Sequence, residues 1–308
     1  MAGQVVVVGS INVDHTVVLD RFPQPGETLL AESMTLSVGG KGANQAVAAA
    51  KSGTDVVMIG AVGDDADGET ALRALERASV ECSRIRRVQG TPAGSAWITV
   101  ASGDNTIVVV PGANDHWPRP TQPLPAADVV LCQLEIPRAT VEATADAAGT
   151  FMLNAAPSQP LSDALLARCD VLIVNEHELT EVSGRQPLAA ADEAAVISAS
   201  HALIQRGVTM VVTTLGGRGA LLCRADVTMR ATAPRVEVVD TTGAGDAFCG
   251  VFAAQVAAGA RLADALRLAV TAGSLSVQSA TAQGGYDGFA DLGDLVRRTP
   301  VVTVLPDV

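Results

Sequence analysis

Residues 240–248 read DTTGAGDAF and combine two glycines with a carboxylate at a predicted helix start. The β-branched residues at 236–239 indicate a strand before this run, and the alanine-rich stretch 246–258 predicts a helix after it. The first turn of a helix leaves N–H groups without partners, and glycines keep side chains away from them. The run is therefore suited to bind an anion such as a phosphate.

Asp246 has two interpretations within this run. A carboxylate beside a phosphate can orient and deprotonate an attacking hydroxyl group, and we expect the helix N-terminus to lower its pKa. Aspartate is also a favoured helix-capping residue, in which case the glycines only end the strand. The run by itself leaves both interpretations open.

A second glycine-rich run, SVGGKGANQA at residues 37–46, leads into a predicted helix at 42–52. Its glycines let a ligand approach the backbone, and Lys41 makes one edge cationic. Asn44 can both donate and accept hydrogen bonds, which suits a polyhydroxyl compound. The run is no Walker A loop, because Gly42 and not Ser or Thr follows the lysine. No dinucleotide-binding glycine motif follows the first strand either, where the chain reads GSINVD.

Polar residues follow several predicted strands, at the sheet edge where ligands of α/β proteins bind. Asn12 and Asp14 come just after the first strand and would share one side of a continuing strand, although Asn and Asp also build ordinary turns. Glu135 follows the strand at 128–134, and Asn175 and Glu178 follow the strand at 171–174. The spacing of Asn175 and Glu178 predicts that both face one way and hold metal-bound water. The glycine-rich loop at 216–219, after Thr214, would let a nucleotide pack against backbone.

The order of predicted elements indicates a doubly wound α/β fold with a mostly parallel sheet flanked by helices. Strands are expected at 5–8, 56–62, 128–134, 151–154, 171–174 and 210–214, and helices at 42–52, 68–78, 138–148, 161–167, 176–183, 192–206, 246–258 and 263–278. Segments 14–38 and 95–110 are predicted to pair as a small β-sheet lid, with ordinary edge strands as the alternative. The main domain would then comprise 1–13, 39–94 and 111–308.

Composition limits the possible partners and the compartment. The 308 residues carry a net charge of −12, which disfavours binding to nucleic acid or to an anionic membrane surface. No apolar run approaches the roughly 18 residues that span a bilayer. The five cysteines are scattered without Cys-x-x-Cys spacing, and the N-terminus shows no signal-peptide pattern. These features predict a cytoplasmic protein.

The runs GGKGANQA at 39–46 and DTTGAGDAF at 240–248, in this order, make residues 5–291 resemble the ribokinase/PfkB carbohydrate kinase family. The resemblance implies an α/β domain with a β-sheet lid and homodimers that pack through the lids. It also implies transfer of a phosphoryl group from ATP to the terminal hydroxyl of a sugar, with Mg²⁺ and K⁺ as further cofactors.

The resemblance also implies roles for individual residues. Asp246 would be the catalytic base, and the backbone amides of Gly243, Ala244 and Gly245 would form the anion hole. Sugar-binding residues would be Asn12, Asp14, Gly40, Lys41, Asn44 and Glu135. Nucleotide-binding residues would be Asn175, Thr214, Gly216, Gly219 and Gly245, while Glu178 would hold Mg²⁺ through water.

The monovalent cation would lie at Asp240, Thr242, Ser276, Ser279, Thr281 and Gly285. Here the sequence departs from the family pattern, because TAQGGYD at 281–287 lacks the serine and proline that commonly complete the cation loop. Backbone carbonyl groups can still serve as ligands, so K⁺ dependence stays open.

The expected reaction is phosphorylation of a pentose, with D-ribose giving ribose 5-phosphate. Deoxyribose, fructose or a nucleoside are alternative acceptors, since one hydroxyl more or less is decided by the shape of the pocket. A non-catalytic sugar sensor is an alternative of a different class, which the intact Asp246 and glycines disfavour.

Overall fold

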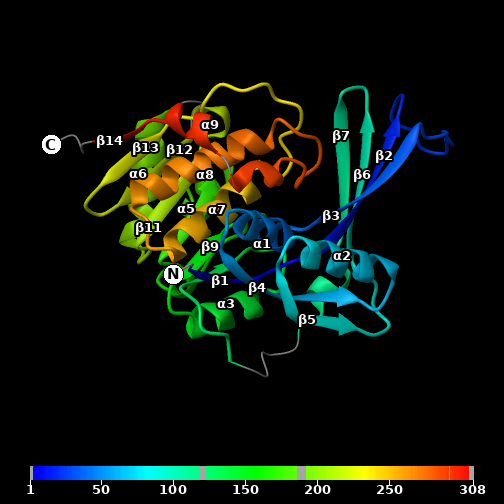
Figure 1. Ribbon diagram of the computed structural model, residues 1–308, viewed down its shortest axis with the longest axis horizontal. Coiled ribbons are helices and arrows are strands. Elements are labelled where there is room, and N and C mark those ends of the chain that lie inside the picture. Colours follow the sequence, from blue (N-terminus) through cyan, green and yellow to red (C-terminus); the bar gives the residue numbers. More distant parts are fainter. Residues whose placement is uncertain (1–2, 118–122, 186–191, 291, 305–308) are drawn as a thin grey trace.

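The computed structural model describes residues 3–117, 123–185, 192–290 and 292–304. A ten-stranded sheet crosses the larger part of the molecule in the order β14-β13-β12-β11-β10-β9-β8-β1-β4-β5, and a separate four-stranded sheet stands off one end (Figure 1). The pairs from β11 to β5 are parallel, whereas β12, β13 and β14 pair antiparallel. The strands of the large sheet are β1 (Gln4–Val8), β4 (Asp55–Gly63), β5 (Glu81–Val88), β8 (Val129–Cys132), β9 (Phe151–Asn154), β10 (Val171–Asn175), β11 (Met210–Thr214), β12 (Ala220–Arg224), β13 (Thr228–Ala231) and β14 (Val301–Val304).

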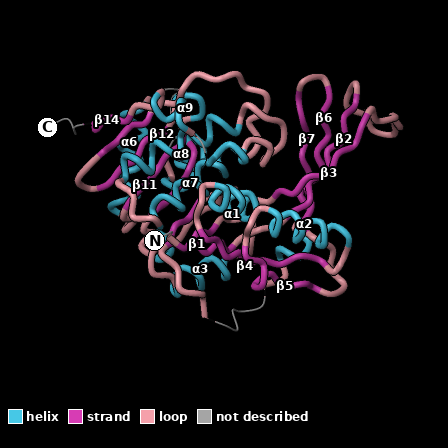
Figure 2. Tube along the Cα trace, viewed as in Figure 1, coloured by secondary structure: helices cyan, strands magenta, loops and turns pink. Residues whose placement is uncertain are grey.

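Helices cover both faces of the sheet, as Figure 2 shows in cyan around the magenta strands. In β1, Val5 and Val7 pack into one core cluster while Val6 and Val8 pack into the other, because neighbouring strand residues point to opposite faces. The first cluster contains α1 (Lys41–Lys51), α2 (Ala66–Arg77), α7 (Ala244–Ala257) and α8 (Leu262–Ser276). The second contains α3 (Arg138–Ala147), α4 (Asp163–Leu166), α5 (Glu176–Ser183) and α6 (Glu193–Gln205). The short helix α9 (Gly293–Arg297) contacts α8.

The strand order reverses at β1, which pairs with β4 on one side and with β8 on the other. The chain crosses from β1 to β4 and β5 before it returns to β8, β9, β10 and β11. Connections therefore leave β1 and β8 in opposite directions, which opens a crevice beyond the carboxyl ends of these strands. The doubly wound prediction is confirmed, and the crevice is where a ligand is expected.

The four-stranded sheet has the order β3-β2-β6-β7, built from β2 (Asn12–Leu19), β3 (Ser33–Gly39), β6 (Gly94–Ala101) and β7 (Asp104–Val110). The two hairpins pair antiparallel within themselves, and β2 pairs with β6 in parallel. This sheet lies apart from the large one, so the alternative of ordinary edge strands is wrong. Its strands begin or end slightly outside the predicted segments 14–38 and 95–110, and closure of this sheet as a lid stays a prediction.

Several elements differ from those predicted from the sequence. The strand predicted at 236–239 is wrong: this segment is irregular, and Val238 and Val239 are 59% and 60% exposed. The backbone N–H of Val239 donates to the carbonyl of Val277 after α8, so no neighbouring strand pairs with it. The helix predicted at 161–167 is confined to α4, and β5, β12, β13 and β14 were not predicted.

Three short 3₁₀ helices complete the elements of the described residues: η1 (Gly112–Asp115), η2 (Gly216–Arg218) and η3 (Tyr286–Ala290). Within the same residues, no helix is both long enough and apolar enough to cross a bilayer.

Candidate active site

Asp246 lies in the first turn of α7 and is buried, with 7% of its surface exposed. The helix is capped by Gly243, in a left-handed conformation with φ of 76°, and no side chain caps it. The two carboxylate oxygens of Asp246 instead accept hydrogen bonds from Nδ2 of Asn44 at 2.9 Å and from Nε2 of Gln45 at 2.8 Å. The interpretation of Asp246 as the helix cap is therefore wrong.

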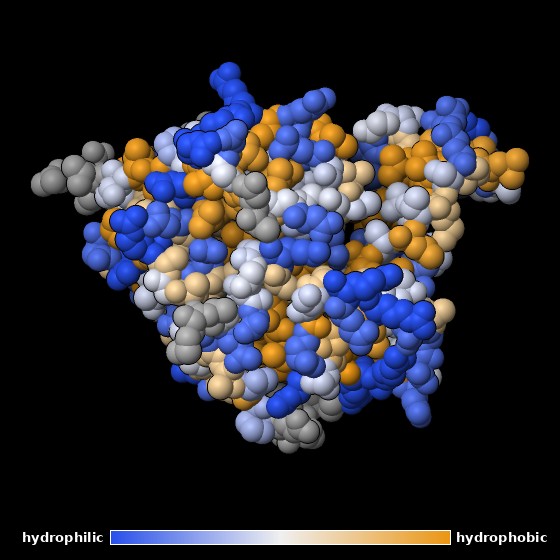
Figure 3. All heavy atoms as spheres, viewed as in Figure 1, coloured by the Kyte–Doolittle hydropathy of each residue, from blue (hydrophilic) through white to orange (hydrophobic). Residues whose placement is uncertain are grey.

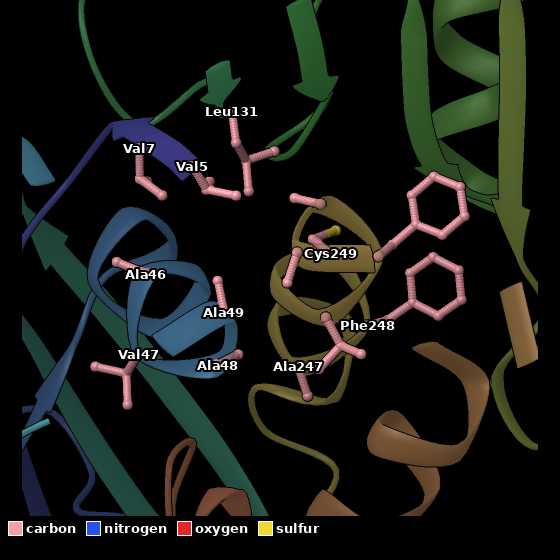
Figure 4. Packing of buried hydrophobic residues seen from close by; sticks show 14 of the residues in the cluster. Val5, Val7, Ala46, Val47, Ala48, Ala49, Leu131, Ala247, Phe248 and Cys249 are labelled. Atoms are coloured by element: carbon pink, nitrogen blue, oxygen red, sulfur yellow. The ribbon is translucent and has the colours of Figure 1, made fainter. Parts of the chain in front are cut away.

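Close packing of α1 against α7 brings these two amides to Asp246 (Figure 4). Small side chains line the contact, including Ala48 and Ala49 on α1 and Ala247 on α7. A Cβ atom at Gly250 would lie only 2.4 Å from the carbonyl oxygen of Gln45. The two helices can approach this closely only because position 250 has no side chain.

Gln45 connects Asp246 to the crevice beyond β8 and β9. Its Nε2 also donates to Oδ1 of Asn154 at 2.9 Å, and its Oε1 accepts from Nε2 of Gln133 at 2.7 Å. All three side chains are buried. Neither Gln45 nor Asn154 has a predicted role, although Gln45 belongs to the run GGKGANQA and Asn154 ends a predicted strand.

Burial raises the pKa of Asp246, and Lys41 and the two amides lower it only in part. The prediction that this pKa is lowered is therefore wrong, because desolvation outweighs the effects of Lys41 and the two amides. For Lys41, burial disfavours the ammonium form, but the carboxylates of Asp246, Glu135 and Glu178 leave its pKa raised. A cation and several carboxylates thus share one poorly hydrated space.

Glu135 fastens the glycine-rich run at the start of α1. Its Oε2 accepts from Oγ of Ser10 at 2.6 Å and from the backbone N–H of Lys41 at 3.0 Å. Gly40, which caps α1 with φ of 84°, lies against the backbone of 10–12. Predicted sugar-binding residues from three separate segments therefore meet here. Ser10, which has no predicted role, joins two of these segments, because its hydroxyl also accepts from the backbone N–H of Gly42.

Asn12 and Asp14 lie on one side of β2, as the alternation predicts, and not in a turn. Oδ1 of Asn12 accepts from Nδ2 of Asn114 at 2.7 Å, so the amide NH₂ group of Asn12 is not used in this contact. Burial, together with Glu135 and Asp246, raises the pKa of Asp14 from 3.8 to about 6, with His15 lowering it. A Cβ atom at Gly39 would lie 2.2 Å from this carboxylate, so the glycine makes room for Asp14.

A small pocket of about 140 Å³ lies beside Asp246 and the start of α7. Its lining includes Lys41, Asn154, Glu178, Gly243 and Gly245. The amides of the first helical turn, the lysine and the dipole of α7 together favour an anion in this pocket.

Asn175 and Glu178 both line this pocket, yet they also form a local structure that sequence analysis did not predict. Oδ1 of Asn175 accepts from the N–H of Glu178, and Oε2 of Glu178 accepts from the N–H of Asn175, each at 2.8 Å. This reciprocal pair is a capping box at the start of α5. Burial raises the pKa of Glu178, while its backbone hydrogen bond and Lys41 lower it in part.

A larger pocket of about 600 Å³ adjoins the start of α7 and shares Thr214 and Gly245 with the small pocket. It contains the predicted nucleotide-binding residues Thr214, Gly216, Gly219 and Gly245. The irregular segment that includes Val236 and Val238 forms another wall, together with residues of α8. An apolar hollow bordered by bare backbone suits a flat heterocycle such as a nucleobase.

The segments predicted to hold a monovalent cation lie together near the anion-binding turn. Asp240 accepts from the N–H of Thr242 at 2.8 Å and from the N–H of Thr281 at 3.1 Å. Gly285 lies against Ser276, since a Cβ atom on it would be 2.7 Å from Cα of Ser276. The N–H of Ser279 donates to the carbonyl of Ser276 at 3.3 Å.

Comparison with known proteins agrees with this arrangement. The sequence profile of the pfkB family of carbohydrate kinases matches residues 2–287. The chain is 38% identical to the ribokinase of Bacillus subtilis over 299 residues, covering 94% of this chain and 98% of that one. It is 33% identical to the deoxyribokinase of Salmonella typhimurium over 301 residues, covering 94% and 97%.

The fold is also similar to solved structures. The ribokinase of Arabidopsis thaliana, determined with ribose and ATP, superimposes with a TM-score of 0.83 at 31% identity, covering 95% of this chain and 99% of that one. Family profile, curated relatives and fold agree over nearly the whole chain. The chain belongs to the pfkB family of carbohydrate kinases, and the protein is an ATP-dependent sugar kinase.

Proposed function

We propose that this kinase phosphorylates ribose at its terminal hydroxyl, giving ribose 5-phosphate. The observation that carries the proposal is the position of Asp246, which two side-chain amides hold beside the anion-binding turn. The ribokinases that match the chain, one of them bound to ribose and ATP, support ribose as the acceptor.

The vicinal hydroxyl groups of the sugar would bind to side chains around the base of β2 and α1. These are Asn12, Asp14, Lys41, Asn44 and Glu135, with the backbone of Gly40. Carboxylate oxygens accept from hydroxyl groups, while the amides of Asn12 and Asn44 donate to them. The terminal hydroxyl group would then face Asp246, within reach of the small pocket.

Asp246 would accept the proton of this hydroxyl as it attacks the γ-phosphate of ATP in line. Burial raises the pKa of Asp246, and a raised pKa makes its carboxylate a stronger base, which suits a group that accepts a proton. The amides of Gly243, Ala244 and Gly245 would stabilise charge on the transferring group. The nucleobase of ATP would lie in the larger pocket, beside Thr214, Gly216 and Gly219.

Mg²⁺ fits the small pocket, because Glu178 supplies a carboxylate there and Mg²⁺ is commonly bound by one or two carboxylates, water and substrate phosphates. Glu178, with Asn175 beside it, would hold the ion through water. When bound, Mg²⁺ supplies positive charge that neutralises the phosphates.

K⁺ fits the loops around Asp240, which offer only oxygen ligands. Asp240, Thr242, Ser276, Ser279, Thr281 and Gly285 would contribute side-chain or carbonyl oxygens. When bound, the ion supplies a fixed positive charge near the anion hole. Comparing activity in KCl and in tetramethylammonium chloride tests this part of the proposal.

We also propose that two copies of the chain form a homodimer through the lid. The register of the small sheet places Val109 on the same face as Asp14. Ile107 and Val109 are more than half exposed, and Figure 3 shows apolar side chains gathered over this sheet. A partner sheet on this face would bury them and cover the sugar. Val109→Asp should give a monomer with a raised KM for ribose, measured by sedimentation and kinetics.

Release of ADP tests the reaction itself. We expect turnover with ribose and MgATP, and loss of turnover in Asp246→Asn. Equal or better turnover with 2-deoxyribose would favour that acceptor, as the similarity to a deoxyribokinase allows. If the protein binds a sugar but releases no ADP from ATP with any pentose, hexose or nucleoside, this would instead indicate a sensor.

A further inference from the structure

Gln283 belongs to the stretch 281–287 that departs from the family pattern, and its side chain reaches into the sugar-binding region. Its Nε2 donates to Oδ1 of Asn44 at 2.8 Å and to the backbone carbonyl of Val38, in β3, at 3.3 Å. One amide group therefore bridges the base of the small sheet and the start of α1.

The surrounding loop is fastened to the anion-binding turn at several points. The hydroxyl of Tyr286 donates to the carbonyl oxygen of Gly243 at 3.0 Å, and a Cβ atom at Gly243 would lie 2.5 Å from the carbonyl oxygen of Ala282. The N–H of Thr281 donates to Asp240. Gln283 thus extends from a loop whose backbone position is fixed on the phosphate side of the site.

The contact with Gln283 determines which way the amide of Asn44 points. Because Oδ1 of Asn44 accepts from Gln283, its Nδ2 is directed to Asp246, where it donates at 2.9 Å. Nδ2 carries a second hydrogen, which remains for a sugar hydroxyl. If the amide turned over, Oδ1 would face the carboxylate of Asp246, and this contact between two acceptors is repulsive.

We propose that Gln283 is a positioning residue, which fixes the amide of Asn44 so that it donates to Asp246 and to the sugar. Gln283 itself needs no contact with either substrate. The inference rests on the proposed function, because it assumes that Asn44 binds the sugar and that Asp246 is the base. It adds that the phosphate-side loop determines the geometry on the sugar side.

Three variants separate positioning from general damage to the loop. Gln283→Met keeps the length and removes both hydrogen bonds, and Gln283→Glu keeps the shape but replaces the donor by an acceptor. Gln278→Met is the matched control, since Gln278 is an exposed glutamine near the end of α8 whose side chain makes no hydrogen bond within the described residues. Steady-state kinetics with ribose and ATP, and thermal melting, are measured for each.

We expect Gln283→Met to lower kcat/KM for ribose by about 3- to 10-fold, the effect of one net hydrogen bond, with KM for ATP changed less than about twofold. Gln283→Glu should lose more, because its carboxylate faces two acceptors. Its activity relative to wild type should recover as pH falls, because a protonated glutamic acid regains an O–H donor. General damage to the loop would instead change KM for ATP as well and lower the melting temperature of Gln283→Met below that of Gln278→Met.

The outcomes distinguish this inference from the proposed function. If wild type turns over ribose and Gln283→Met matches Gln278→Met within twofold, the inference is overturned and the proposed function stands. A defect confined to KM for ATP, or a Gln283→Glu variant without recovery at low pH, also overturns it. Absence of ribose turnover in the wild type overturns both.

Discussion

Replacing Asp246 by asparagine preserves the size of the side chain and exchanges one acceptor for a donor. Asp246 accepts from both Asn44 and Gln45, so an amide at position 246 leaves one of their N–H groups facing an NH₂ group. Loss of a general base typically lowers turnover by about 10²- to 10⁴-fold. In transition-state free energy this corresponds to about 2.7–5.4 kcal/mol.

The difference in stability between wild type and Asp246→Asn should depend on pH in a defined direction. The pKa of Asp246 is raised in the fold from 3.8, so the neutral carboxyl group is favoured there over the carboxylate. Its contribution to stability is complete below pH 3.8 and is lost as pH rises through the raised pKa. Asparagine does not titrate, and its unpaired donor costs about 1–3 kcal/mol at every pH. We therefore expect the variant to melt below wild type at pH 4, and this difference to shrink by pH 8.

The assay measures ADP release at saturating ribose and MgATP, with ribose binding followed by calorimetry. Asp294→Asn is a matched control, because Asp294 is highly exposed on α9 and lines neither of the two pockets. We expect the control to keep full turnover, and Asp246→Asn to bind ribose while losing at least about 100-fold in kcat. Turnover of Asp246→Asn within about tenfold of wild type would refute the assignment of Asp246 as the base.

Three other changes test separate parts of the structure. Ribose affinity, measured by calorimetry without ATP, should fall as pH drops through about 6, because Asp14 is then protonated and loses its carboxylate form. The variant Asp14→Asn should bind ribose more weakly than wild type, but its affinity should not show this pH dependence. Gly250→Ala should lower the free energy of unfolding by about 1–3 kcal/mol in urea and also lower kcat, since its methyl group would push Gln45 away. Thr281→Gly should raise the free energy of unfolding by about 1 kcal/mol, because φ of 68° strains a β-branched residue; an unchanged urea midpoint would contradict this.

The central fold was predictable because its strands are buried on both faces. Strands such as β1 and β10 therefore appear in the sequence as continuous runs of apolar residues, separated by helical patterns. The antiparallel edge was not predictable in the same way, since β13 and β14 are short and partly exposed. The error at 236–239 has a related cause. Valine favours strands, but a strand also needs a neighbour, and this segment borders a pocket instead.

Residue types in the sequence indicated candidate site residues, but they did not indicate the hydrogen bonds that join these residues. Gln45 joins Asn154 and Asp246 across 109 and 201 positions of sequence, and such contacts exist only once α1 packs on α7. No local pattern contains this information, because it depends on the absence of a side chain at Gly250 on the facing helix.

The two interpretations of Asp246 differ in what its carboxylate must contact. A cap has to accept from amides of its own helix, whereas a base has to be held by other groups and remain open to a substrate. In α7 the backbone of Gly243 makes the cap without a side chain, so the carboxylate is left for donors from α1. Burial then raises its pKa, which a cap at the surface would not experience. The glycine that shapes the anion-binding turn is thus also the reason that Asp246 is available as a base.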